Sequence, residues 1–272
     1  MHIFLRGMAV GVTESVPGVS GSTVAIILGI YNQLLYSLSL LTTPRRKEAL
    51  PFLFVFGIGM VCGFGMSIYI VDYFLHNFQA PTLMFFAGVV LGFLPDLWKE
   101  TISHTAFKIK WKYWGILVFS CLLVVFSQFL VDVKVLDVEQ LSIVTCIFLI
   151  AAGFLASSAL VLPGMSGALI LTILGTYEVA VQSLKSMNLP VVLAVGSGVI
   201  LGVLVMSRFI QFLLKRYPLG TYLAIIGLLS GSVFAIIYSI EDQVGIASLG
   251  FIIIGIIVVT TLTKTKIKVS EL

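Results

Sequence analysis

The sequence predicts an all-α integral membrane protein made of two inverted repeats, each a re-entrant helical hairpin followed by three transmembrane helices. Three observations predict this fold: a very apolar composition, a motif that occurs twice, and the placement of the basic residues. The 272 residues are 59% hydrophobic and 10% charged, with a mean hydropathy of +1.14. A soluble core of this length could not enclose so much apolar surface, which excludes a soluble enzyme.

Long uncharged segments account for this composition. Runs of about 18 residues or more, for example 114–131, 191–207 and 219–240, can each cross roughly 30 Å of hydrocarbon as a helix. The first apolar run is interrupted by Glu14 and lacks a small-residue cleavage pattern, so we expect it to remain in the mature protein. The three cysteines lie in apolar segments without metal-ligand spacing, so we expect neither a disulfide framework nor a metal site.

An internal repeat is the strongest pattern in the chain. Segment 16–22, VPGVSGS, aligns with 162–168, LPGMSGA, at an offset of 146, which also aligns 28–31, LGIY, with 174–177, LGTY. After a loop that is seven residues longer in the first copy, the offset becomes 139. It then pairs identical residues: Pro51 with Pro190, Gly57 with Gly196, Gly59 with Gly198, Gly63 with Gly202, Thr82 with Thr221, Gly88 with Gly227, and Gly92 with Gly231. The chain therefore divides into repeats 1–131 and 142–272.

Basic residues predict the orientation, because short cytoplasmic loops are enriched in Lys and Arg. Placing both termini in the cytoplasm puts 13 of the 16 basic residues on that side. Segments at about 8–41 and about 142–185 then begin and end on the same side, so we expect each to turn back as a re-entrant hairpin. Because three spans follow each hairpin, the second repeat is inverted relative to the first.

The two Pro-Gly-x-Ser-Gly motifs predict broken helices at membrane depth. Non-helical backbone is tolerated there only inside protein or beside a wet cavity, so both breaks should meet at one cavity. Free amides and hydroxyls where a helix restarts would suit phosphate or carboxylate. The predicted anion-binding residues are Gly18, Ser20, Gly21, Ser22, Thr23, Gly164, Ser166 and Gly167. The alternative is a Pro-Gly kink without a ligand, against which the duplication argues.

Charged residues in the apolar segments are further candidates. Glu14 precedes the first break and its repeat partner is Leu160; an acid at membrane depth is costly, and we expect it to couple transport to H+ or Na+. The alternative is a partly exposed Glu at the hairpin mouth. Arg208 could pair with a phosphate oxygen, or its side chain could extend to the cytoplasmic headgroups. Additional candidates for the site are Glu178, Tyr31 and Tyr177.

Gly18-Val-Ser-Gly21 also matches the Gly-x-Ser-Gly motif of rhomboid-type intramembrane proteases. Hydrolysis requires a base beside the serine, normally His. His2, His76 and His104 fall at the N-terminus, at an outer edge and in a cytoplasmic loop. We therefore expect that the protein is not an enzyme.

Segments 17–23, PGVSGST, and 163–167, PGMSG, with the Gly-x-Tyr at 29–31 and 175–177, resemble the bacterial polyprenyl-phosphate transporter family over essentially the whole chain. The resemblance implies a flippase that returns undecaprenyl phosphate, the lipid carrier of cell-wall precursors, from the outer to the inner leaflet of the plasma membrane. It also implies a phosphate head between the two Ser-Gly helix starts and an isoprenoid tail in lipid. The chain departs from the family pattern at Ser22, often Gly, at Asn32, often Glu, and at Glu14, often Asp.

A carrier or channel for a small soluble anion is the alternative function, since the same helix starts would suit it. For the lipid transporter, we expect alternating access and no cofactor beyond a coupling H+ or Na+. The expected partners are polyprenyl phosphate and membrane lipids, with no nucleic acid. The sequence also allows a homo-oligomer.

Overall fold

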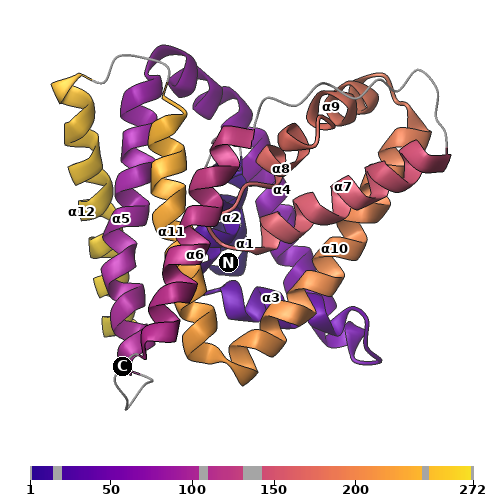
Figure 1. The fold of residues 1–272 in the computed structure, drawn as a ribbon. Helices are drawn as coiled ribbons and strands as arrows, with labels where there is room; N and C mark the ends of the chain where they lie inside the picture. The colour runs from indigo at the N-terminus through magenta and orange to yellow at the C-terminus, as the bar shows by residue number, and fades with distance from the viewer. Residues whose placement is uncertain (1, 15–19, 104–109, 131–142, 241–244, 271–272) are drawn as a thin grey trace.

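The fold, seen in a computed structural model, is helical, as the sequence predicts (Figure 1). The structure describes residues 2–14, 20–103, 110–130, 143–240 and 245–270. Within these ranges there is no β-strand. The fold class is therefore confirmed as all-α.

The chain forms two successive sets of six helices. The first set comprises α1 (His2–Thr13), α2 (Gly21–Ile27), α3 (Tyr31–Leu40), α4 (Arg46–Asn77), α5 (Gln79–Ser103) and α6 (Trp111–Ser127). The second set comprises α7 (Ile143–Val161), α8 (Gly167–Ile173), α9 (Tyr177–Lys185), α10 (Leu189–Arg216), α11 (Pro218–Tyr238) and α12 (Ile246–Ser270), and a short 3-10 turn, Gln128–Leu130, follows α6. The offset of 146 carries α2 onto α8, and the offset of 139 carries the start of α5 onto the start of α11.

Glycines set the corners of both hairpins. Gly29 and Gly175, which are repeat partners, both have φ of 66°, a conformation that costs glycine little and other residues more. Between α2 and α3 the chain bends by 118°, which fits either a broken span or a re-entrant loop. Re-entry of segment 8–41 from the cytoplasm stays a prediction.

Five described helical segments are long and apolar enough to cross a membrane. They are Arg46–Ser67, Gln79–Ile102, Ile143–Val161, Leu189–Arg216 and Pro218–Tyr238, and the bent pair α2–α3 would make six. The segment predicted as the second re-entrant hairpin, about 142–185, thus contains α7, a helix long enough to span by itself, and its re-entry stays a prediction. By contrast α6 and the Ser248–Thr263 part of α12, both predicted spans, are shorter apolar helices.

Equivalent glycine contacts join helices within each half. A Cβ on Gly7 of α1 would overlap the Phe56 carbonyl oxygen of α4, and a Cβ on Gly153 of α7 would overlap that of Val195 in α10. Gly7 and Gly153 are repeat partners, as are Phe56 and Val195. Small residues allow this close approach of helices in lipid, where packing replaces the hydrophobic driving force. The helix pairs α1–α4 and α7–α10 are therefore built in the same way.

The last helices are exchanged between the halves. Gly88 of α5 packs against the backbone of Ile252 in α12, whereas its repeat partner Gly227 of α11 packs against Leu117 in α6. Each half thus covers the fifth helix of the other, which joins the two halves into one bundle. Leu117 and Ile252 thus occupy equivalent positions, because each contacts one of the paired glycines. The offset that relates α6 to α12 is therefore 135.

The ends of the helices separate along the long direction of the molecule. In Figure 1, α4 and α6 begin at the lower end of the molecule, and α5, α10 and α12 end there. At the upper end, α6 and α11 end and α10 begins. The basic residues at 45–47 and 215–216 therefore lie at the same, lower end. This agrees with the charge-based grouping, and its assignment to the cytoplasm stays a prediction.

Candidate functional site

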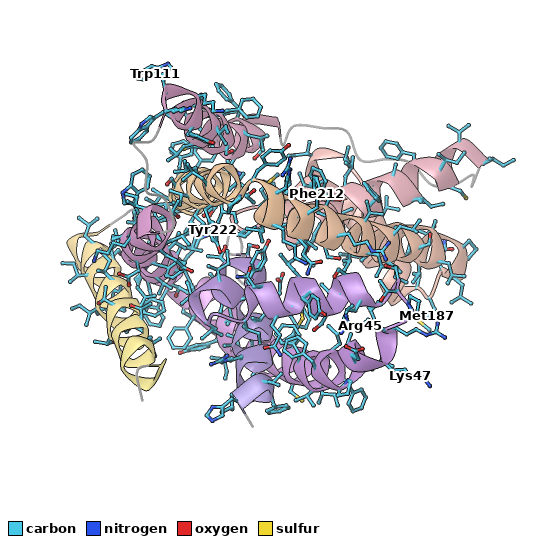
Figure 2. All side chains as sticks on the ribbon, turned by 90° about the horizontal axis from the view of Figure 1, so that it is seen from below. Arg45, Lys47, Trp111, Met187, Phe212 and Tyr222 are labelled. Carbon is cyan, nitrogen blue, oxygen red and sulfur yellow. The ribbon has the colours of Figure 1, made fainter. Side chains whose placement is uncertain are left out.

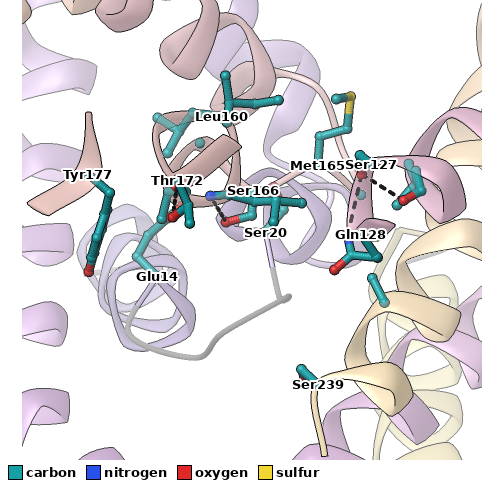
Figure 3. A pocket seen from close by; sticks show the side chains of 17 residues that line it. Glu14, Ser20, Ser127, Gln128, Leu160, Met165, Ser166, Thr172, Tyr177 and Ser239 are labelled. Carbon is teal, nitrogen blue, oxygen red and sulfur yellow. Dashed lines mark hydrogen bonds between the residues drawn. The ribbon is translucent and has the colours of Figure 1, made fainter. Parts of the chain in front are cut away.

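A cavity of about 340 Å3 lies where the α7–α8 break meets α2, α6 and α11. Its size falls in the range of small-molecule sites, roughly 300–1,000 Å3. The polar side chains that line it are those of Glu14, Ser20, Ser127, Gln128, Ser166, Thr172, Tyr177 and Ser239. Figure 3 shows Glu14, Ser20 and Ser166 on one side of the space, with Ser127 and Gln128 across it. Both hairpins therefore contribute to a single cavity.

Residues of the first half satisfy the backbone of the second break. Pro163 has no N–H, so α7 ends with carbonyls that lack their helical partners. The hydroxyl of Tyr31 donates to the Val161 carbonyl at 3.0 Å, and the N–H of Gly164 donates to Thr23 Oγ1 at 3.1 Å. Two hydrogen bonds thus connect the α2–α3 hairpin to the break beneath the cavity.

Gly164 cannot be replaced by a larger residue without strain. Its φ is +84°, and a Cβ there would lie 2.6 Å from the carbonyl carbon of Leu228 in α11. A left-handed conformation and a close backbone approach both favour glycine. The break is therefore held against α11 as well as against the first hairpin.

Glu14 is the one side chain with a full charge when ionised among the described residues that line the cavity. Its Oε1 accepts the N–H of Gly21 at 3.0 Å, so an internal carboxylate already lies at the start of α2. A Cβ on Gly21 would overlap that same oxygen, so a larger residue there would displace the Glu14 carboxylate. No basic side chain offsets the charge of Glu14 within the described lining.

The predicted phosphate residues separate into two groups. Ser20, Gly164, Ser166 and Gly167 line the cavity, and Ser166 accepts the N–H of Leu169 at 3.4 Å as the N-cap of α8. Gly21, Ser22 and Thr23 are buried and are not among its lining residues. Ser22 instead shares a hydrogen bond of 2.6 Å with Ser20, through the two hydroxyls. Gly18 lies outside the described residues.

Arg208 lies outside the cavity lining. Its guanidinium donates to the carbonyls of Ser39 at 3.4 Å and Thr42 at 3.1 Å, at the C-terminal end of α3. A cation there caps free carbonyls and complements the helix dipole. Arg208 thus makes a structural contact with α3, which neither predicted role, pairing with a phosphate or extending to the headgroups, anticipated.

The additional candidates lie in three different places. Tyr177 lines the cavity, whereas Tyr31 lies beside a second, smaller cavity and holds the Val161 carbonyl. Glu178 is exposed in the first turn of α9 and is not in the lining of either cavity. Of these three residues, only Tyr177 faces the site.

Sequence reasoning missed the polar contribution of α6 and α11. Ser127 and Gln128 interrupt the apolar run 114–131, a signal that could have identified them. Ser239, directly after α11, and Thr172 in α8 gave no comparable signal. No histidine occurs in the described lining, so a Ser-His pair as in a protease is not formed there.

A cavity with polar side chains between apolar helices that can span a bilayer is typical of multi-pass membrane carriers, and this chain is a multi-pass membrane protein. A family model described as VCA0040-like, undecaprenyl phosphate translocase-like, matches residues 10–249, and the chain belongs to this family. It is 36% identical over 268 residues to a polyprenyl-phosphate transporter of Staphylococcus aureus, covering 96% of this chain and 95% of that protein.

A second relative comes from Vibrio cholerae serotype O1. It is also named a polyprenyl-phosphate transporter and is 28% identical over 246 residues, which are 85% of this chain and 76% of that protein. The search of solved structures gave no match. The family and the names of these relatives agree with the expectation that the protein is a transporter and not an enzyme.

Proposed function

We propose that this protein carries polyprenyl phosphate across the membrane, with the phosphate head in the 340 Å3 cavity and the isoprenoid tail in lipid. The observation that carries the proposal is that Ser20 of the first motif and Ser166 of the second line one cavity. The named transporters among the relatives supply the substrate. Because the described lining contains no cation, hydrogen bonds rather than ion pairs would hold the phosphate.

The donors for the phosphate would be hydroxyl groups and backbone amides. Ser20 and Ser166 present hydroxyls from the two halves, and Gly167 places backbone in the lining without a side chain to obstruct it. The hydroxyls of Ser127 and Ser239 and the amide of Gln128 could close around the head from α6 and α11. The predicted contact with Arg208 is not part of this site, because its guanidinium binds the α3 carbonyls.

Glu14 would couple transport to a proton. A phosphate that enters the cavity meets the Glu14 carboxylate, and two like charges in a poorly solvated space repel each other strongly. Protonation of Glu14 removes this repulsion and weakens its hold on the Gly21 N–H. A proton would therefore travel with the phosphate, and Na+ beside Glu14 is the other ion to be tested.

The direction of transport would be from the outer to the inner leaflet of the plasma membrane, for reuse of the carrier lipid, with both termini in the cytoplasm. The cavity lining includes Ser127 and Gln128 at the end of α6 and Ser239 after α11. Both helices end at the upper end in Figure 1, opposite the start of α4, which the basic residues at 45–47 adjoin. If the positive-inside rule holds for this chain, the cavity is on the outer side.

Transport in liposomes tests the proposal. Purified protein would be reconstituted with labelled undecaprenyl phosphate, and the lipid remaining in the outer leaflet measured with and without a pH or Na+ gradient. We expect movement with the wild type, a loss of about tenfold or more with Ser166→Ala because its hydroxyl contributes to a desolvated anion site, and no response to the gradient with Glu14→Gln. An unchanged leaflet distribution with all proteins would refute lipid transport. Competition by inorganic phosphate alone would favour the soluble-anion carrier.

A further inference from the structure

A second cavity has a volume of about 160 Å3. Its lining includes Tyr31, Asn32, Glu100 and Tyr222, with Ile225 among its apolar residues. Figure 2 shows from below that Tyr222 lies toward the middle of the molecule, whereas Trp111 and Lys47 lie at its edges. Tyr222 is near the start of α11 and Ser239 follows its end, so the two cavities lie toward opposite ends of this helix, and Asn32 and Glu100 of the small cavity are exposed.

Three residues that line the small cavity have repeat partners that line the large one. Tyr31 of the small cavity corresponds to Tyr177 of the large one, and Glu100 corresponds to Ser239. Ile26 and Thr172 form a third pair. The large cavity is within the usual volume range of ligand sites and the small one is below it. One member of an equivalent pair is therefore wide and the other narrow in this structure.

The tyrosine of the narrow cavity is buried and hydrogen-bonded, whereas its repeat partner in the wide cavity is exposed. Tyr31 is 5% exposed and donates its hydroxyl to the Val161 carbonyl, directly before the break that lines the large cavity. Tyr177 is 43% exposed, and its hydroxyl has no hydrogen-bond partner among the described residues. The Tyr31–Val161 bond joins a wall of the narrow cavity to the helix that ends beneath the wide one. The Tyr31–Val161 and Thr23–Gly164 hydrogen bonds together close the layer of protein between the small and the large cavity.

We propose that the small cavity is a second site for the phosphate head, reached when the Tyr31–Val161 hydrogen bond breaks. This inference rests on the proposed lipid transport. The hydroxyls of Tyr31 and Tyr222 and the Asn32 amide supply hydrogen-bond donors, and Glu100 supplies a carboxylate as Glu14 does above. Release of Tyr31 frees its hydroxyl for the phosphate and allows the small cavity to widen. Tyr31 thus keeps the small cavity closed while it is bonded to Val161 and contacts the phosphate head once it is released.

Cysteine labelling tests this proposal with two reporters on one helix. Ile225 and Ala235 of α11 are both buried, and they line the small and the large cavity respectively. Each would be changed to Cys in a background without Cys62, Cys121 and Cys146, and labelled with a polar maleimide in detergent. We expect Tyr31→Phe to speed labelling at position 225 about fivefold, the effect of losing one buried hydrogen bond, without speeding it at 235. Tyr177→Phe, the matched control, should not speed labelling at 225.

A second measurement does not depend on the Tyr31 variant. With Tyr31 in place, saturating undecaprenyl phosphate should slow labelling at both 235 and 225, because the head occupies both sites. An unchanged rate at 225 in both experiments, or an equal increase with Tyr31→Phe and Tyr177→Phe, would overturn the second site. If liposomes show no lipid transport but Tyr31→Phe still opens position 225, the proposed function fails and the closing role of Tyr31 stands.

Discussion

Replacing Thr23 with valine tests whether the first hairpin stabilises the second break. Valine keeps the shape of Thr23, which is 1% exposed, but removes the oxygen that accepts the Gly164 N–H at 3.1 Å. An unpaired buried N–H costs about 1–3 kcal/mol. At about 2–4 °C for each kcal/mol, the melting temperature of the purified protein should fall by roughly 2 to 12 °C.

Thr221→Val provides a matched control. Thr221 is also buried, but its hydroxyl donates to the Tyr217 carbonyl of its own helix turn, and that carbonyl also accepts the Thr221 N–H at 3.0 Å. This variant therefore leaves no backbone group unpaired, and we expect a change within about 0.5 kcal/mol. Thermal unfolding in detergent, followed by intrinsic fluorescence, measures both. Equal shifts for the two variants would refute the reasoning that the Thr23 bond holds the break.

Three further predictions concern the cavity and its supports. Glu14→Gln should bind undecaprenyl phosphate at least as tightly as the wild type, measured by equilibrium binding at neutral pH, because the like charge is removed; weaker binding would argue that Glu14 helps to hold the head. Gly164→Ala should lower stability by more than about 2 kcal/mol through its φ and its overlap with Leu228, whereas Gly196→Ala, where a Cβ meets nothing within 4 Å, should not. Arg208→Gln should cost about 0.3–1 kcal/mol at the α3 terminus and leave lipid affinity unchanged; a large affinity loss would return Arg208 to the site.

The ends of the helices beside the two motifs could be predicted because single residues decide them. Pro163 and Gly164 stop α7, and the Gly29 and Gly175 corners need a positive φ that glycine adopts readily. The repeat offset then transfers each boundary to the other half, and α2 and α8 correspond residue for residue. Helix ends that depend on the backbone properties of proline and glycine can therefore be predicted from the sequence.

Contacts between distant helices could not be predicted in this way. The exchange of α6 and α12 between the halves depends on how whole helices pack, and the offset of 139 does not extend to it. Arg208 shows the same limit, because its partners are backbone carbonyls that any sequence would supply at the end of α3. The cavity residues Thr172 and Ser239 are ordinary polar residues that only the packing of α8 and α11 brings to the site.

Cross-linking of the lipid head tests the central claim most directly. Polyprenyl phosphate with a photoreactive group next to the phosphate would be bound to the purified protein, irradiated, and the modified peptides identified by mass spectrometry. We expect modification within 160–172 and at or near Glu14, with competition by unlabelled polyprenyl phosphate but not by the uncharged polyprenol. Modification confined to the outer faces of α4 and α12, or equal competition by polyprenol, would contradict a phosphate site in the cavity.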